Sequence, residues 1–242
     1  MGRQERLNEI YKPLIDFTVV KERMSLADGE EKILNEIWGP FLVETTTQYE
    51  ESELKAVIVG QENNGWMKEN YFHFLDSRQP MERALREYRE FVAKWEYKSP
   101  FFQYFHDLRE QIHGSAGLVK KQSVLWSNLF KVNHNGKSTL ASTHYEKMLA
   151  LQSGIFRAEM EILNPEVVIF LTGPRYDQVI EKFYDDAKFI AVEPHLGRQV
   201  ARVEATGLPM LAFRSYHPSY VNRKSAERKV WYDAIVEQVR RR

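Results

Sequence analysis

The chain has 242 residues, and 43% of them are hydrophobic, which is enough for one large domain with a sizeable buried core. Its 34 basic and 34 acidic side chains give a formal net charge of zero. This excludes the overall basic surface of many nucleic-acid-binding proteins, so any contact with DNA must be local. The absence of cysteine excludes disulfides, thiolate nucleophiles, iron–sulfur clusters and cysteine-bound zinc.

The first fifty residues are rich in charged side chains, with apolar residues three and four positions apart. This spacing predicts helices, so we expect a helical extension over residues 1–50 that packs on a domain formed by residues 51–242. The beginning of the chain is too polar for a secretory signal, and no run approaches the ~20 apolar residues of a membrane helix. We therefore expect a cytoplasmic protein that makes no contact with a membrane.

The middle of the chain alternates between strand-like and helix-like patterns. Residues 54–60 (LKAVIVG) are a short apolar run that ends in glycine, which predicts a buried parallel strand leading into a loop. Apolar stripes predict a helix over residues 81–97, ended by Pro100, and a second helix that includes residues 105–112. Residues 123–132 (SVLWSNLFKV) predict another buried strand.

The remaining elements continue the alternation. The predicted helices cover residues 145–163, 175–184 and 225–239. The predicted strands cover residues 167–173, 188–192 and 209–215. This order indicates an α/β fold, a three-layer α/β/α sandwich with a mostly parallel central sheet. Ligands of such sheets bind beyond the carboxyl ends of the strands, so the loops that leave these ends form the candidate site.

The sequence GQENNGW follows the first predicted strand directly. Gly60 permits a sharp turn of the backbone, and Gln61, Glu62 and Asn63 carry amide and carboxylate groups. Such groups suit a pocket that positions a water molecule and hydrogen-bonds a heterocycle. The alternative is an ordinary Asn-Gly turn with solvated neighbours.

Two more polar residues lie in or after predicted strands. His217 follows the strand over residues 209–215 and is placed to act at the same edge of the sheet, although His-Pro-Ser also suits the start of the last helix. Asn128 interrupts an apolar strand. Its amide either bonds to neighbouring backbone or offers a donor and an acceptor to the edge of a pyrimidine.

Other side chains have weaker signals. Phe72 and Phe74 belong to an aromatic cluster of the kind that usually packs in a core, but one of them is a candidate for stacking on a base. Arg223 and Lys224 follow His217 and suit either phosphate contacts or a solvated surface. Walker A, GxGxxG and GxSxG patterns are absent, and the seven histidines show no metal-ligand spacing. We therefore expect neither a metal nor a cofactor.

The order of these loops resembles the uracil-DNA glycosylase superfamily. That superfamily has a first loop of the GQDPYH or GxNPG kind, and a last loop with HPSP followed by a wedge segment. Here the matching stretches are GQENNG at residues 60–65 and HPSYVNR at residues 217–223, with Asn128 in a middle strand. The resemblance runs in order over residues 54–240.

The resemblance implies an enzyme of base excision repair that flips a base out of DNA and hydrolyses its N-glycosidic bond. The substrate is uracil or a related deaminated base, and the enzyme works as a monomer. In this reading Glu62 positions the water and His217 hydrogen-bonds the leaving base. The implied base-binding residues are Gln61, Asn63, Asn128 and either Phe72 or Phe74. The implied DNA-contacting residues are Ser219, Tyr220, Val221, Arg223 and Lys224.

The chain also departs from the superfamily's pattern. Asn63 stands where a proline is usual, and no tyrosine or histidine follows to block thymine, so selectivity for uracil is not implied. Tyr220 stands in place of the second proline of HPSP, and Glu62 is longer than the usual Asp or Asn. Two alternatives therefore stay open. One is a binding protein for nucleic acid or nucleotides on the same fold, and the other is a hydrolase of free nucleosides.

Overall fold

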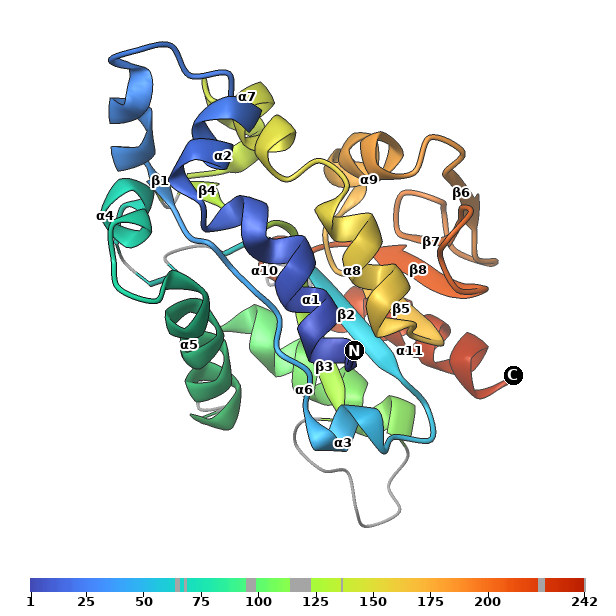
Figure 1. Cartoon of the computed structure of the whole chain (residues 1–242). Helices are drawn as coiled ribbons and strands as arrows, with labels where there is room; N and C mark the ends of the chain where they lie inside the picture. Colours follow the sequence, from blue (N-terminus) through green and yellow to red (C-terminus); the bar gives the residue numbers. More distant parts are fainter. Residues whose placement is uncertain are drawn as a thin grey trace. The chain divides into compact units, whose positions relative to one another are not determined.

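The computed structural model describes residues 1–63, 66–67, 69–94, 99–113, 123–135, 137–221 and 225–241. The protein is an α/β protein with a six-stranded, mostly parallel sheet flanked by helices (Figure 1). This confirms the predicted fold class. Among the described residues, none of the helices has the length and apolar character needed to cross a bilayer.

The strand order in this sheet is β3-β2-β5-β8-β7-β6. The strands are β2 (Ala56–Glu62), β3 (Val124–Phe130), β5 (Val167–Phe170), β6 (Lys188–Ala191), β7 (Val200–Glu204) and β8 (Leu211–Ser215). β2 pairs with β5 and β5 with β8 in parallel, so that Ala56 lies opposite Val167 and Val167 opposite Leu211. β7 is antiparallel to both β8 and β6. The sheet thus has an antiparallel edge that the sequence analysis did not predict.

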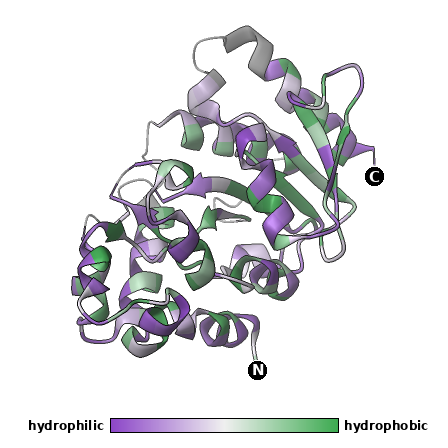
Figure 2. Cartoon of the chain, turned by 90° about the horizontal axis from the view of Figure 1, so that it is seen from above, coloured by the Kyte–Doolittle hydropathy of each residue, from purple (hydrophilic) through white to green (hydrophobic). Residues whose placement is uncertain are grey.

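The burial of each strand explains its sequence. All residues of β3 and β5 are buried, as are the first five of β2, so these strands are near-continuous apolar runs. In Figure 2 the helices carry both hydrophilic and hydrophobic segments, whereas hydrophobic colour predominates along several strands. β2 extends two residues farther than predicted, so Gln61 and Glu62 end the strand instead of opening the loop.

The chain separates into two compact units, each assembled from three segments. Unit 1 comprises Met1–Glu44, Glu62–Ala93 and Asn128–Ile162. Unit 2 comprises Thr45–Gln61, Lys94–Ser127 and Leu163–Arg242. Residues 1–44, most of the predicted N-terminal extension, are therefore grouped with two later segments of the chain.

Unit 1 is mainly helical. Its helices are α1 (Arg3–Tyr11), α2 (Phe17–Arg23), α4 (Tyr71–Leu75), α5 (Pro80–Lys94), α7 (Tyr145–Leu151) and α8 (Ile155–Leu163), with the last residue of α5 and of α8 assigned to unit 2. The 3-10 helices are η1 (Lys12–Leu14), η2 (Glu30–Asn35) and η3 (Thr139–Ala141). A two-stranded antiparallel ribbon joins β1 (Ile37–Trp38) to β4 (Asn133–His134). The single helix predicted over residues 145–163 is wrong, because Gly154 adopts a φ of 77° and separates α7 from α8.

Unit 2 holds most of the sheet and the helices α3 (Thr47–Glu50), α6 (Pro100–His113), α9 (Asp177–Phe183), α10 (Pro218–Val221) and α11 (Ser225–Arg240), with the 3-10 helix η4 (Pro174–Tyr176). Pro100 begins α6, whereas we expected it to end the preceding helix. The first turn of a helix tolerates proline, because the backbone N–H that proline lacks would have no partner within the helix at that position.

A buried ion pair organises unit 1. Lys131, just after β3, donates from Nζ to Oε1 of Glu159 on α8 over 2.8 Å, and both side chains are 0% exposed. The hydroxyl of Tyr11 on α1 donates to the other carboxylate oxygen. Burial lowers the pKa of Lys131, while the charge of Glu159 opposes that shift. The pair therefore fixes the backbone that follows β3 against α1 and α8.

A second charged side chain organises unit 2. Arg214 on β8 is 1% exposed, and its Nε and Nη2 donate to the two carboxylate oxygens of Asp177 over 2.8 and 2.9 Å. The same guanidinium donates to the carbonyls of Gly197 and Arg198, each over 2.9 Å. Arg214 therefore joins β8 to the start of α9 and to the segment before β7.

Candidate functional site

The first candidate loop begins with two side chains that are anchored to backbone. Gln61 donates from Nε2 to the carbonyl of Thr172 over 2.6 Å. The carboxylate of Glu62 accepts the N–H of Thr139 over 3.2 Å. Both side chains are partly exposed. The two polar groups therefore lie at the end of the buried strand, and the sequence did not show that η3 would hold the carboxylate.

Asn63 is only 2% exposed, so it is more buried than we expected for a residue of a polar loop. Its Nδ2 donates to the carbonyl of Lys131 over 3.4 Å, and its own carbonyl accepts Nδ2 of Asn133 over 3.1 Å. A Cβ added to Gly39 would lie 2.8 Å from the Lys131 carbonyl and 3.2 Å from Asn63 Nδ2. Only glycine permits this close approach, so Asn63 is held between two backbone segments of unit 1.

Three polar atoms linked to this region are buried without a hydrogen-bond partner among the described residues. They are Oδ1 of Asn63, Oδ1 of Asn133 and Oγ1 of Thr139. Leaving such an atom unpaired costs about 1–3 kcal/mol, and groups of them mark places where a ligand or water binds. We call Glu62, Asn63, Asn133 and Thr139 the polar cluster of unit 1. The sequence analysis did not single out Asn133 or Thr139, although Asn133 follows the Asn128 strand closely.

Asn128 lies inside β3 and is 1% exposed. Every residue of this strand is buried, so its amide must be satisfied inside the protein or by a bound ligand. This burial fits both interpretations from the sequence, a hydrogen bond to neighbouring backbone and contact with the edge of a pyrimidine.

The two candidate stacking rings differ in exposure. Phe74 is 0% exposed and packs against Tyr71, with ring centroids 6.2 Å apart, and under the guanidinium of Arg83. It therefore exposes no ring face in this structure, and a role in base stacking stays a prediction for either ring. Phe72 is 40% exposed and contacts Phe17 through a ring edge at 5.8 Å. Phe72 is the more exposed candidate.

His217 follows β8 in unit 2 and has a defined proton position. Its Nδ1 accepts the backbone N–H of Ser219 over 3.2 Å, so in the neutral ring the proton is on Nε2. Burial lowers the pKa of His217 to about 4, which keeps the imidazole neutral at pH 7. The Phe101 ring stacks against it at 5.7 Å with an interplanar angle of 21°. His217 is thus a neutral, oriented N–H donor.

The segment after His217 forms the short helix α10. The N–H of Tyr220 donates to the His217 carbonyl over 3.0 Å, and its ring stacks on Tyr216 at 4.9 Å while remaining 69% exposed. Ser219 is also exposed. Val221 is the last residue of α10, but its side chain lies outside the described set, as do residues Arg223 and Lys224.

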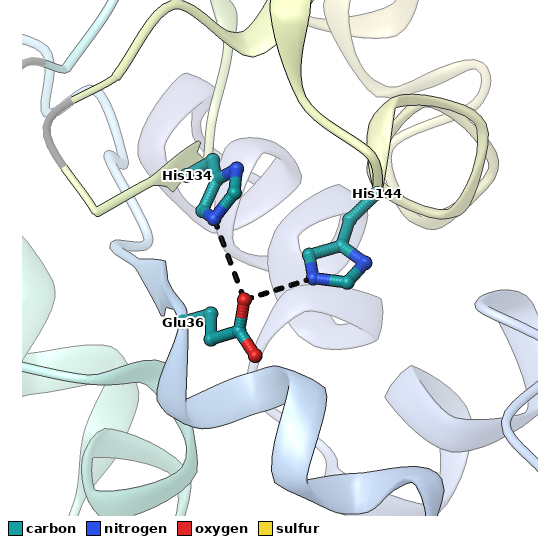
Figure 3. Close-up of side chains that lie close together, drawn as sticks. All are labelled: Glu36, His134 and His144. Atoms are coloured by element: carbon teal, nitrogen blue, oxygen red, sulfur yellow. Dashed lines mark hydrogen bonds and ion pairs between the residues drawn. The ribbon is translucent and has the colours of Figure 1, made fainter.

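A separate group of ligand-type side chains lies in unit 1, where we expected no metal site. Glu36, His134 and His144 place a carboxylate oxygen and two imidazole nitrogens within 4.8 Å of one another (Figure 3). Burial lowers the pKa of His134, with further contributions from His144 and Lys137. The two histidines are ten positions apart and Glu36 is remote in sequence, so the spacing of these residues does not predict a metal site.

The fold is that of an α/β protein with a mostly parallel sheet, a class in which ligands bind beyond the carboxyl ends of the strands. The model of the uracil DNA glycosylase superfamily matches residues 47–240, so the chain belongs to this superfamily. Its members are typically DNA glycosylases. No curated protein matches the chain. The family match confirms the resemblance that the loops indicated. Glu36 lies before the matched residues.

Proposed function

We propose that the protein is a DNA glycosylase that hydrolyses the N-glycosidic bond of uracil or a related deaminated base. The observation that carries this proposal is the neutral, oriented His217 imidazole in the HPS loop of a chain of this superfamily. A DNA duplex with a flipped base is the expected substrate.

The reaction needs a hydrogen-bond donor on the leaving base. Cleavage of the N-glycosidic bond develops negative charge on the base and positive charge on the sugar. The Nε2–H of His217 suits the pyrimidine oxygen on which that negative charge gathers. In the neutral ring Nδ1 accepts the Ser219 N–H, so the ring donates through Nε2–H, and burial strengthens this hydrogen bond.

The carboxylate of Glu62 suits the task of orienting the attacking water. The hydrogen bond from Thr139 N–H holds the carboxylate in place. The unpartnered Oδ1 of Asn63 offers an acceptor in the same cluster. In this proposal Asn128 reads the pyrimidine edge and Phe72 stacks on the base.

Contact with the duplex is assigned to the segment after His217. Tyr220 is an exposed aromatic ring, supported from behind by Tyr216, and with Val221 it suits the gap left by a flipped base. Ser219, Arg223 and Lys224 are proposed to contact phosphates, which position the duplex without reading its sequence.

The test is a set of duplex oligonucleotides that each contain one uracil, hypoxanthine or xanthine. After incubation with the protein and then alkali, we expect strand breakage at the modified position. His217→Ala and Asn128→Ala should each lower the rate by about 10²–10⁴-fold, the usual cost of removing a group that stabilises developing charge. His195→Ala, which changes another unit 2 histidine, is the matched control. No breakage on any of these bases would refute the proposal.

A second candidate is a protein on the same fold that binds nucleic acid without cleaving it. It is favoured by the formal net charge of zero and by Asn63 in place of the usual proline. A gel shift of the uracil duplex without strand breakage supports this candidate. A gel shift accompanied by breakage supports the glycosylase.

A further inference from the structure

We propose that Glu36, His134 and His144 bind one divalent transition-metal ion, represented here by Zn²⁺, at a site distinct from the residues assigned to base excision. The three side chains come from different parts of unit 1. Glu36 joins η2 to β1, His134 lies on β4, and His144 immediately precedes α7.

The distances fit coordination of a metal ion, and His144 Nε2 also lies within hydrogen-bonding distance of Glu36 Oε2. Nε2 of His134 and Nε2 of His144 both face the same oxygen, Oε2 of Glu36, at 3.5 and 3.2 Å (Figure 3). A charge-assisted hydrogen bond would be shorter, about 2.7–2.9 Å. Tetrahedral Zn²⁺ with bonds of about 2.0–2.1 Å keeps its ligand atoms about 3.3 Å apart. The two observed distances lie on either side of that value.

A neighbouring hydroxyl orients the His134 ring as metal sites require. Nδ1 of His134 lies 2.8 Å from Oγ of Ser142, and the same oxygen accepts the backbone N–H of His144 over 2.9 Å. When Nδ1–H donates to Ser142, the lone pair of Nε2 points toward Glu36. Such outer hydrogen bonds fix the tautomer of metal-bound histidines. Ser142 therefore positions one ligand directly and the backbone of the other.

The backbone holds the ligands in place before any ion arrives. Ile37, next to Glu36, pairs with His134 in the β1–β4 ribbon. The side chains of His134 and His144 are 11% and 15% exposed, while that of Glu36 is 55% exposed. The carboxylate thus gives an ion access from solvent, and three protein ligands leave a fourth position for water.

Two imidazoles and one carboxylate select the class of ion. This donor set suits Zn²⁺, Fe²⁺, Ni²⁺ or Cu²⁺, whereas Mg²⁺ and Ca²⁺ prefer oxygen ligands throughout. A bound ion would also have a structural effect. His134 follows Asn133, whose side chain binds the Asn63 carbonyl, so the ion would brace the ribbon that supports the polar cluster.

The test is metal binding by the full chain after treatment with a chelator, followed by calorimetric titration with Zn²⁺ and measurement of the metal retained after dialysis. We expect one Zn²⁺ per chain, undisturbed by excess Mg²⁺. Glu36→Gln and His144→Asn should each weaken binding at least ~10-fold, and Ser142→Ala about 10- to 100-fold. His73→Asn, which changes an exposed histidine of unit 1, should bind Zn²⁺ as the unchanged protein does.

Two results would overturn the proposal. One is the lack of stoichiometric Zn²⁺ binding by the unchanged protein, and the other is equal binding by the His144→Asn variant. If a variant fails to fold, the unchanged protein still decides the matter. Co²⁺ at this site must give the visible absorption of a low-coordinate complex, and Zn²⁺ must displace it. Neither readout depends on glycosylase activity.

Discussion

The partly exposed imidazole of His217 is expected to make the stability of the protein sensitive to acid. The pKa of His217 is lowered by burial to about 4 from an ordinary value of 6.5. Between these values the unfolded chain binds a proton that the folded protein does not. The contribution of His217 to stability is therefore complete above about pH 6.5 and is lost as the pH falls toward 4.

We expect the free energy of unfolding to decline more steeply between pH 6.5 and 4.5 in the unchanged protein than in His217→Gln, because glutamine does not titrate. Urea unfolding at several pH values measures both slopes. Titration of the His217 Cε1–H signal by NMR gives the pKa directly. A value at or above 6.5 would contradict the proposed neutral donor.

Residue types that follow buried strands were the most informative part of the sequence. Glu62, Asn63 and His217 could be selected because a polar group after an apolar run lies at the edge of a sheet. Phe72 and Phe74 could not be separated, because a two-residue difference on a short helix decides which ring faces the core. The polar cluster of unit 1 depends on tertiary hydrogen bonds between residues that are far apart in sequence, and no local sequence pattern predicts such bonds.

At the scale of secondary structure, Arg214 is the clearest test of how β8 is held. Arg214→Met should destabilise the protein by about 3–5 kcal/mol, because it leaves the largely buried Asp177 carboxylate without its cation and two carbonyls without donors. Thermal or urea unfolding measures the loss.

The neighbouring strand provides a matched control for this prediction. Arg202 on β7 pairs with Glu204, and their side chains are 47% and 46% exposed. Arg202→Met should change stability by no more than about 1 kcal/mol, the usual upper range for a surface pair. Equal effects of the two substitutions would show that burial of Arg214 contributes little.

The errors at this scale have local causes. β7 has only five residues, and two of them are exposed, so VARVE lacks the long apolar run that identified β2 and β5. The break between α7 and α8 rests on the backbone conformation of Gly154, whereas the apolar spacing continues across it. The alternation of the central elements was strong enough to predict the α/β class despite both omissions.

For the whole molecule, zero net charge limits how DNA can be held. With phosphate contacts confined to a few side chains, each contributing about 0.9 to the slope of log affinity against log salt, affinity should fall only about 10- to 100-fold between 50 and 200 mM salt. Gel-shift titration with the uracil duplex at several salt concentrations measures this slope. A loss of more than about 10³-fold would indicate an extended basic surface, contrary to the expectation of local contacts.

The discontinuous makeup of unit 1 has a consequence for synthesis on the ribosome. The hydroxyl of Tyr11 meets Glu159, and the guanidinium of Arg23 meets the carbonyl of Leu151, so the first helices bind partners that are translated much later. Domains generally fold as units while the chain emerges. Unit 1 cannot close until its third segment, which ends at Ile162, has left the exit tunnel. Until then, the apolar faces of α1 and α2 lack their native cover and are the natural targets of chaperones on the nascent chain.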